Sequence, residues 1–350
     1  MKKSLRNNFM KKIKQILRPL YLPIVNYKDS NFYKGYELIS NFFEDYLLYK
    51  KYSIVFSKKD IKNKEADLIL HYHSIEKGML FTKMKSGFAK NRVENLHRML
   101  DDSEVKANMN RDQIKTAYRI MCEYYELHQK ANYDISTIYT LEQYNVYKNI
   151  LSNSYTTDFS GKINWIRDTF YNDVKSDFHN FAHSRKSVRE FTGEKIESSI
   201  LKKVIDLANT APSVCNRQAS NIYLLEDKDK IEKVLEIQAG FAGYTDNVSQ
   251  LLVLTNDRKY YYTVGERNQF YIDGGAYLMN LLYALHYYKI ANCPANWGKT
   301  KSDDQLVRKI IAIPEAEKII CMVPIGIAKD SFRTTLSLRR SHSENLICFK

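Results

Sequence analysis

Three separated segments of the sequence carry side chains that suit the binding of an anion or of a flat heterocycle. The first runs from Ser184 to Phe191 and reads Ser-Arg-Lys-Ser-Val-Arg-Glu-Phe. Guanidinium groups beside a serine hydroxyl suit a terminal phosphate, because several charge-assisted hydrogen bonds converge on its oxygens. A basic stretch is also typical of a solvated surface, so this segment needs the support of the other two.

The second segment, residues 211–218, reads Ala-Pro-Ser-Val-Cys-Asn-Arg-Gln and directly follows an expected helix. Its turn and its amide side chains offer donors and acceptors for the edge of a heterocycle, although an ordinary helix-ending loop has a similar composition. The third segment is the late basic pair Arg339-Arg340. Two interpretations of this pair stay open: a return to the same phosphate, and a charged tail.

The order and spacing of these segments together resemble the nitroreductase family. The sequence has an R-x-S-x-R stretch that opens the domain and an A-P-S-x-x-N-x-Q loop after the first long helix. A central helix that contains Gly and Ala follows, and a basic pair comes after the final strand. The resemblance covers residues 180–345. It implies an FMN-dependent oxidoreductase whose flavin lies at the interface of an intertwined homodimer.

The resemblance also implies cofactor-binding roles, residue by residue. The ribityl phosphate would be held by Arg185, Ser187, Arg189 and Arg339 or Arg340. The other subunit would line the flavin with Pro212, Ser213 and Asn216. The segment that passes near the reactive N5 would be Pro294, Ala295 and Asn296. Lys186 stands where Arg or His is more common in the family, and it keeps one cation there. Asp273 is expected to have a structural role as a hydrogen-bond partner.

The flavin itself would carry the electrons, so we assign no catalytic side chain and no metal site. The implied cycle is a ping-pong one, in which NADH or NADPH reduces the flavin and leaves. A small-molecule acceptor, such as a quinone, a nitro compound or a specific metabolite, then takes its place. The sequence has Ala219-Ser220 where many family members have Pro-Trp. This difference changes the pocket wall and argues against the usual nitroaromatic substrates.

Residues 71–80 carry one more motif, His-Tyr-His-Ser-Ile-Glu-Lys-Gly-Met-Leu. It resembles the H-x-x-E-K-G signature of nitroreductase-like proteins that have a long helical extension and are associated with bacterial surface-polysaccharide clusters. Two alternatives to a reductase stay open: an assembly or partner-binding protein with little or no activity, which Ala219-Ser220 and the basic N-terminus favour, and a specialised flavin reaction without NAD(P)H. A metal site at His71, His73 and Glu76 is conceivable, but a helix-end hydrogen-bond cluster is favoured because one helical spacing is weak support.

Periodic patterns predict the elements that position these segments. The predicted helices span 112–129, 197–209 and 268–288, and the predicted strands span 221–225, 251–255 and 319–328. A few short strands beside a long helix indicate an α+β fold. We expect a mixed central sheet flanked by helices and preceded by a helical N-terminal region. The predicted domains are a basic segment over 1–36, a helical extension over 37–180 and a flavin domain over 181–350.

The sequence of 350 residues has a net charge of +14, and +8 of this charge lies in residues 1–36. No DNA- or RNA-binding motif accompanies the charge, so a nucleic-acid partner is not expected. Residues 1–20 predict a short basic amphipathic helix, suited to peripheral contact with an anionic membrane or to packing on protein. Five widely spaced cysteines indicate neither a disulfide framework nor a zinc site. Without a membrane-spanning run or a signal peptide, a cytoplasmic location is expected.

Overall fold

The computed structural model describes residues 30–56, 58, 60–81, 84–152, 161–261 and 263–349. The amphipathic helix predicted within residues 1–20 lies outside these ranges. The chain divides into two compact units. Unit 1 comprises residues 1–57 and 261–268, and unit 2 comprises residues 58–260 and 269–350.

Unit 1 is built on the helix α2 (Asn31–Tyr52), which begins at the N-cap Ser30. No residue of this helix is buried. Arg267 follows the short helix η5 (Val264–Glu266). Its guanidinium donates two hydrogen bonds, of 2.9 and 3.0 Å, to the carboxylate of Asp45 on α2. This pair holds the pKa of Asp45 below its usual range through the hydrogen bond from the guanidinium.

Unit 2 begins with a bundle of helices. They are α3 (Ile61–Gly78), α4 (Lys90–Leu100), α5 (Ser103–Ala107), α6 (Asp112–Lys130) and α7 (Leu141–Leu151). α3 packs against α4 and α6, and α6 packs against α7. Their shared core includes the fully buried Leu68, Ile75 and Tyr118. The prediction of a helical N-terminal region is therefore confirmed, and α6 follows the periodic pattern that predicted it.

The rest of unit 2 contains a five-stranded sheet in the order β2-β3-β6-β4, with β5 also paired to β6. The strands are β2 (Ser220–Leu225), β3 (Gln250–Asp257), β4 (Ala291–Asn292), β5 (Ala295–Asn296) and β6 (Glu317–Gly326). The α+β class is confirmed. The expected mixing of strand directions is not found, because every pair among these strands is antiparallel. Residues 239–249 return the chain to the end of β2, where Leu225 pairs with Leu251.

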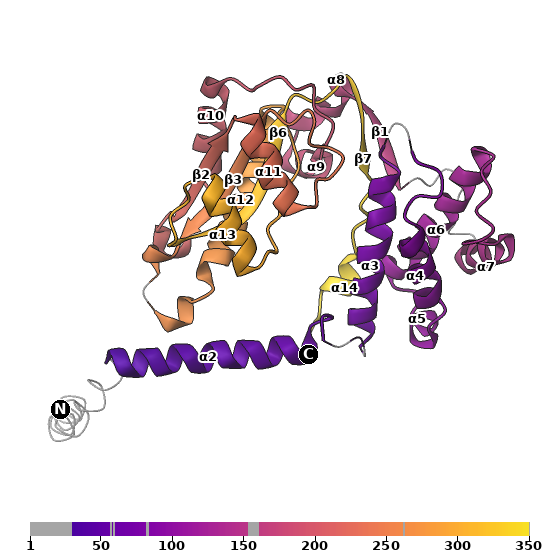
Figure 1. Ribbon diagram of the computed structural model, residues 1–350, viewed down its shortest axis with the longest axis horizontal. Coiled ribbons are helices and arrows are strands. Elements are labelled where there is room, and N and C mark those ends of the chain that lie inside the picture. Colours follow the sequence, from indigo (N-terminus) through magenta and orange to yellow (C-terminus); the bar gives the residue numbers. More distant parts are fainter. Residues whose placement is uncertain are drawn as a thin grey trace, which may run out of the picture. The chain divides into compact units, whose positions relative to one another are not determined.

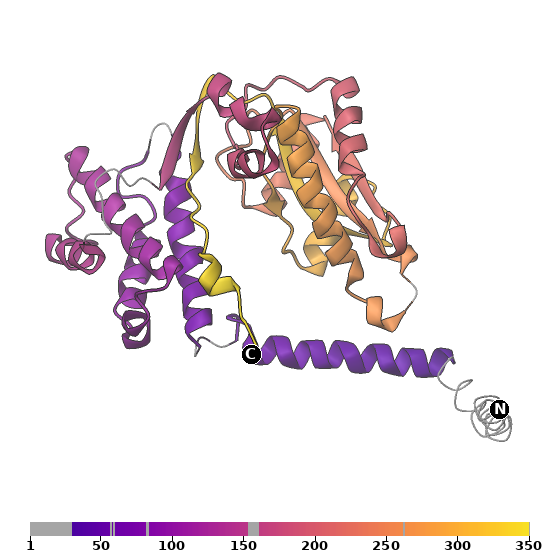
Figure 2. The same cartoon turned by 180° about the vertical axis from the view of Figure 1, so that it is seen from behind.

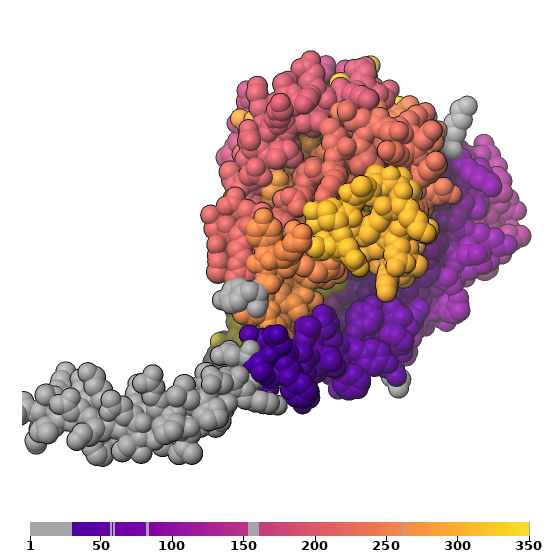
Figure 3. Space-filling model, turned by 60° about the vertical axis from the view of Figure 1, so that its left-hand side comes forward, coloured from indigo at the N-terminus to yellow at the C-terminus, as the bar shows by residue number. Residues whose placement is uncertain are grey.

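Helices cover both faces of the sheet. Alternate residues of β3 point to opposite sides: Leu251 and Val253 belong to one core cluster, whereas Leu252 and Leu254 belong to another. The first face carries α11 (Lys228–Gln238) and α13 (Lys301–Ile310), which pack side by side and lie in front of the sheet in Figure 1. Figure 3 shows α13 in gold beside α11 on the surface. The second face carries α10 (Ser198–Ala208) and α12 (Gln269–Tyr287), which lie in front in Figure 2.

A two-stranded ribbon joins the bundle to the sheet. Strand β1 (Lys162–Ile166) pairs antiparallel with β7 (Ser331–Thr335). The remaining short elements of unit 2 are α8 (Arg167–Phe170), η2 (Asn172–Lys175), α9 (Phe178–Ser184), η3 (Val214–Asn216), η4 (Arg258–Tyr260) and α14 (His342–Asn345). After β7 the chain leaves the sheet and runs beside α3, as Figures 1 and 2 both show. None of the helices in the described ranges is both long and apolar enough to cross a membrane.

Candidate functional site

Three cations predicted to bind phosphate gather where α9 ends. Arg185 directly follows α9, and its Nη1 atom is buried with no hydrogen-bond partner. Burial and the nearby charge of Arg339 hold the pKa of Arg185 below its ordinary value, and the same two causes lower the pKa of Lys186. No carboxylate of the described residues forms an ion pair with any of the three cations. An anion would therefore stabilise this cluster, which we call the cation cluster.

The other contacts of the cation cluster are hydrogen bonds to main-chain carbonyl groups. Lys186 Nζ donates to the carbonyl of His183 at 3.0 Å, and Arg339 Nη1 donates to that of Ser337 at 2.9 Å. The lysine thus satisfies the last turn of α9, where a cation also meets the negative end of the helix dipole. These bonds orient the side chains without neutralising their charge. Ser187 lies in the same stretch, half-buried, between Lys186 and the buried Val188.

A buried histidine supports the cation cluster from α12. His286 Nε2 lies 2.7 Å from the hydroxyl oxygen of Ser184. Burial, together with the positive charges of Arg185 and Lys186, lowers the pKa of His286 to about 4. The imidazole is therefore neutral near pH 7, and it adds no further charge to the cluster.

Arg189 lies on a different side of this stretch. It is 9% exposed, and its Nη1 atom makes a long contact of 3.5 Å to the carbonyl oxygen of Ser187. Its positive charge is felt by Lys77, whose pKa is lowered chiefly by burial. Tyr244 also feels this charge, although burial raises the pKa of its phenol to about 12. The structure thus places Arg189 with Lys77 and Tyr244, and it groups Arg339 with Arg185 and Lys186.

The segment 293–297 is pinned to the edge of the sheet. Ala295 and Asn296 form β5 and pair with Met322 and Cys321 of β6. Trp297 is buried, and its indole N–H donates to Asp304 at 2.6 Å. Pro294 is half-buried, whereas the side chain of Asn296 is exposed. Because both ends of the segment are fixed, its main chain is held in a defined position.

The turn at 212–218 has an unusual backbone. Cys215, Asn216 and Gln218 all have positive φ, near +50°, which costs a non-glycine residue free energy unless its surroundings hold it. Two contacts do so: the Gln218 N–H donates to Ser213 Oγ at 2.9 Å, and the Val214 N–H donates to the Asp273 carboxylate at 3.2 Å. The structural role expected for Asp273 is thereby confirmed. Pro212, Ser213 and Asp273 also line a cavity of about 200 Å³.

The two groups of predicted residues meet α12 at opposite ends. The turn at 212–218 is tied to Asp273, near the start of the helix, whereas the cation cluster lies at His286, near its end. His286 follows Asp273 by thirteen positions, which corresponds to about 20 Å along a helix. One chain therefore does not bring Pro212, Ser213 and Asn216 together with Arg185.

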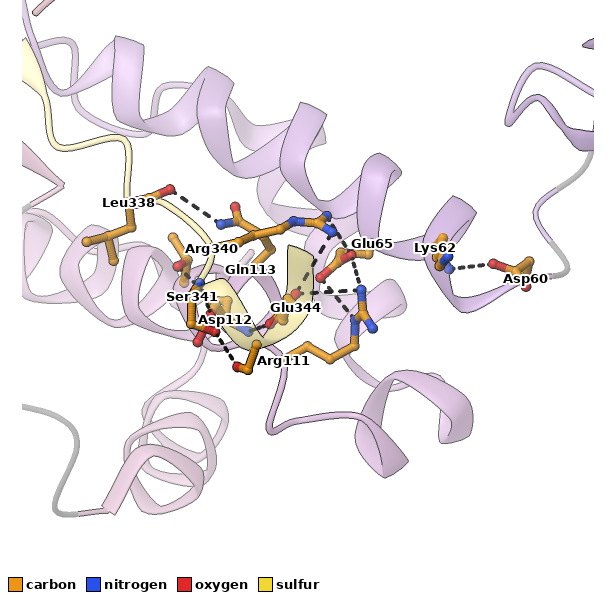
Figure 4. Close-up of polar contacts among 12 residues, drawn as sticks. Asp60, Lys62, Glu65, Arg111, Asp112, Gln113, Leu338, Arg340, Ser341 and Glu344 are labelled. Carbon is orange, nitrogen blue, oxygen red and sulfur yellow. Dashed lines mark hydrogen bonds and ion pairs between the residues drawn. The ribbon is translucent and has the colours of Figure 1, made fainter. Parts of the chain in front are cut away.

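Arg340 is not part of the cation cluster. It donates a hydrogen bond of 2.7 Å to Glu65, a fully buried carboxylate of α3 (Figure 4). Arg111 contacts the same carboxylate through two hydrogen bonds of 2.7 and 3.1 Å. The pairing of Arg340 with Glu65 fits neither interpretation of the basic pair, and phosphate binding by Arg339 stays a prediction. Arg339 returns to the stretch at 184–187, and Arg340 fastens the tail.

The histidines of the 71–80 motif contact side chains of their own bundle. His71 Nδ1 lies 3.2 Å from Arg92, and His73 Nδ1 lies 3.0 Å from Glu76. In the described ranges, no three His, Cys, Asp or Glu residues are grouped so that they could hold a metal ion. The motif also brings Lys77 to Gly240, in the part of unit 2 that holds the five-stranded sheet and its covering helices, which we call the sheet domain. The sequence patterns did not reveal this contact. Gln238 donates a hydrogen bond to the 293–297 segment. The sequence did not predict this role, because a single glutamine at a helix end belongs to no recognisable motif.

Comparison with known proteins bears on the region that holds these residues. The nitroreductase family model matches residues 182–255. This match includes the stretch at 184–191 and the turn at 212–218. A protein of Archaeoglobus fulgidus, which carries the provisional name NADH dehydrogenase/NAD(P)H nitroreductase, is 24% identical over 151 residues. That alignment covers 42% of this chain and 83% of the relative.

Two solved structures show the extent of the similarity. An FMN-dependent nitroreductase from Clostridium difficile is 16% identical, with a TM-score of 0.38 over 47% of this chain and 92% of that one. A nitroreductase-like protein from Streptococcus mutans is 20% identical, with a TM-score of 0.43 over 50% of this chain and 98% of that one.

Proposed function

We propose that the sheet domain binds FMN and that the protein is an FMN-dependent oxidoreductase. The observation that carries this proposal is the buried Nη1 atom of Arg185, which has no partner and lies beside two further unneutralised cations. A buried guanidinium N–H without an acceptor costs free energy, and a phosphate oxygen would remove that cost. The match of residues 182–255 to the nitroreductase family supports a flavin phosphate as the anion.

The residues present fit such a cofactor. Arg185 and Arg339 would hold the phosphate, with Ser187 as a further donor. Arg189 and Cys293 both influence the pKa of Lys77, and on this ground we place Arg189 beside the flavin ring together with Pro294, Ala295 and Asn296. When bound, FMN would supply the redox chemistry, a ping-pong transfer of electrons from NADH or NADPH to a quinone, a nitro compound or a specific metabolite. The chain's own part is to bind, orient and exclude water.

The proposal includes a homodimer with a shared flavin site. The two halves of the predicted site lie about 20 Å apart along α12, so a second copy would have to supply Pro212, Ser213 and Asn216. An apolar stripe on α12 is open for such a partner. Ile272 and Met279 are exposed by 63% and 37%, and between them a Cβ atom on Gly275 would meet nothing within 4 Å. This spacing of three and four residues is that of a helix-packing face.

The experiment that tests FMN binding is a titration followed by a reduction. Purified protein is mixed with FMN, passed through a desalting column and examined for flavin absorbance, and NADH or NADPH is then added without oxygen. Retained flavin that bleaches with either nucleotide is the expected result. Flavin that is retained but stays oxidised would point to another donor or to a specialised reaction. The proposal is contradicted if the protein leaves the column without flavin and also shows no binding of FMN when the two are mixed in solution.

A partner-binding role without reductase activity is the second candidate, and α2 favours it. This helix has no buried residue, and it exposes large apolar side chains such as Phe32 and Ile39, which are 75% and 72% exposed. Exposed apolar groups of this kind are typical of interaction surfaces. If the protein fails to bind FMN, this role in assembling a surface-polysaccharide enzyme becomes the leading hypothesis.

A further inference from the structure

The motif Glu76-Lys77-Gly78 ends α3 at the side of the bundle that meets the sheet domain. Glu76 is 2% exposed, so the motif is anchored in the bundle. Gly78 permits a close approach of Phe88, since a Cβ atom at this position would lie 2.2 Å from the aromatic ring. Lys77, between them, is half-buried and points out of the bundle toward residues of the sheet domain.

Three contacts join this end of α3 to residues 240–244. Lys77 Nζ donates to the carbonyl oxygen of Gly240 at 2.7 Å, and the Tyr244 hydroxyl donates to the carbonyl oxygen of Lys77 at 3.1 Å. Phe81 stacks on Tyr244 with their ring centroids 4.8 Å apart. A Cβ atom on Gly243 would lie 2.9 Å from the ring of Phe81, so the loop approaches the bundle closely.

From Gly240 a chain of hydrogen bonds continues into the predicted flavin segment. The Gly240 N–H donates to Gln238 Oε1 at 2.8 Å, and Gln238 Nε2 donates to the carbonyl oxygen of Asn296 at 2.8 Å. Gln238 is 7% exposed. Its amide uses the oxygen as acceptor and the nitrogen as donor, so a flipped amide would set like groups against each other. The orientation of this side chain is therefore fixed by both neighbours.

We propose that Lys77 is a positioning residue for the flavin site, acting through Gly240 and Gln238 on the main chain at Asn296. This inference rests on the proposed FMN function for its meaning, although the contacts themselves need no flavin. The carbonyl and the N–H of Gly240 belong to two successive peptide groups joined at its Cα atom, so Lys77 acts by holding the backbone of Gly240 in place through a charge-assisted hydrogen bond. The helical bundle is then a component of the flavin site. The E-K-G motif supplies both the lysine and the close contact that aims it.

Hydrogen exchange of the protein without flavin tests the proposal. Lys77→Met removes the first bond. Lys90→Met is the matched control, because Lys90 is 60% exposed and its ion pair with Glu94 is long, at 4.0 Å. We expect roughly tenfold faster exchange of amides in 239–244 and 293–298 in Lys77→Met, as for the loss of one charge-assisted bond. Lys77→Arg should restore part of the protection. Unchanged exchange at 293–298 in Lys77→Met would overturn the proposal.

A double-mutant cycle with Gln238→Met separates the relay from a general loosening. If Lys77 acts through Gln238, adding Lys77→Met to Gln238→Met will raise exchange at 293–298 little further. Additive effects would mean that Lys77 acts by another route, and they would refute the relay. Gln238→Met also tests the relay from its other end if Lys77→Met does not fold.

Measurements with FMN connect the relay to the site. In protein loaded with FMN, Lys77→Met should shift the visible flavin spectrum and the midpoint potential, whereas Lys90→Met should leave both unchanged. A flavin environment identical in the two variants contradicts a positioning role. Wild-type protein that does not bind FMN would refute the proposed function, and the exchange experiment without flavin would still decide whether the relay exists.

Discussion

The guanidinium of Arg340 donates to the fully buried carboxylate of Glu65 at 2.7 Å, and this ion pair fastens the C-terminal tail to the helical bundle. Arg111 binds the same carboxylate from α6. Glu344 completes the network, since its Oε1 accepts the N–H of Asp112 at 2.8 Å. The preceding residue, Arg339, lies in the cation cluster with Arg185 and Lys186. The bundle thus determines where a proposed phosphate ligand lies.

Glu65→Gln should destabilise the protein strongly. The substitution removes the nearer of two carboxylates that Arg111 and Arg340 share, since Glu344 lies 3.8 and 3.9 Å from them. Breaking a buried pair typically costs about 3–5 kcal/mol. We expect a somewhat smaller loss in the free energy of unfolding, because both arginine side chains keep some contact with solvent. Urea unfolding measures this loss. Glu94→Gln is the control, since Glu94 is 47% exposed and should change stability by less than about 0.5 kcal/mol. Equal losses in the two variants would contradict a structural role for the network.

Arg185→Met should weaken FMN binding by roughly 10- to 100-fold, the effect of losing a charged hydrogen bond of about 1.5–3 kcal/mol. Arg185→Lys keeps the charge but loses the planar fork, so its affinity should lie between those of Arg185→Met and wild type. Quenching of flavin fluorescence gives the dissociation constants. Lys228→Met serves as control, because that lysine is 65% exposed on α11. If the Arg185 and Lys228 variants bind FMN equally well, Arg185 does not hold the phosphate.

His286 should make the protein less stable in mild acid. The pKa of this imidazole is about 4 in the folded protein against an ordinary 6.5, because burial and two cations oppose its charging. As the pH falls below 6.5, His286 becomes protonated in the unfolded chain, whereas in the folded chain it stays neutral until about pH 4. The free energy of unfolding therefore falls as the pH drops through this window, by at most about 1.4 kcal/mol per pH unit from this residue.

Unfolding curves at several pH values between 7.5 and 4.5 check this expectation. Wild type should lose stability more steeply than His286→Phe, which cannot titrate at this position. His97 has a pKa lowered to about 4 by burial, so a residual slope remains in both proteins. Parallel pH profiles for the two proteins would show that His286 titrates alike in the folded and unfolded chains.

Much of the fold follows from local periodicity. The helices whose bounds were predicted match closely, as α12 (Gln269–Tyr287) shows, because apolar residues recur at helical spacing over many turns. No bounds were predicted for the long helices α2 and α3. The strands β2, β3 and β6 were found for a similar reason. The strands β4 and β5 were not predicted, because each has only two residues and so shows no alternation of apolar and polar side chains. The antiparallel order depends on how residues 239–249 return, and local patterns do not encode this.

The candidate site was predictable in its parts and not in its grouping. Residue types near Arg185 and Asn216 pointed to a phosphate and a heterocycle. Whether Arg339 or Arg340 turns toward Arg185 depends on Glu65, which lies 275 residues away from Arg340 along the chain. Lys77 was visible as part of a motif, but its partner Gly240 is a main-chain carbonyl and leaves no trace in residue type.

Gly275→Leu offers a sharp test of the proposed dimer. A Cβ atom at this position meets nothing within 4 Å in one chain, so a larger side chain should fit an isolated subunit, and leucine also favours the helix over glycine. If a second copy packs against α12 at Gly275, the same side chain will force the two helices apart. Sedimentation equilibrium should therefore show a dimer for wild type and dissociation for Gly275→Leu, with the folded content unchanged.

FMN affinity should fall together with the dimer, because the turn at 212–218 would no longer reach the cation cluster of the other chain. Gly35→Leu is a matched control, since a Cβ atom there also meets nothing within 4 Å, and it lies on α2 instead. A Gly275→Leu variant that stays dimeric and keeps its affinity would place the interface elsewhere. A monomer that binds FMN as tightly as the wild-type dimer would show that one chain suffices, and the shared site would then be wrong.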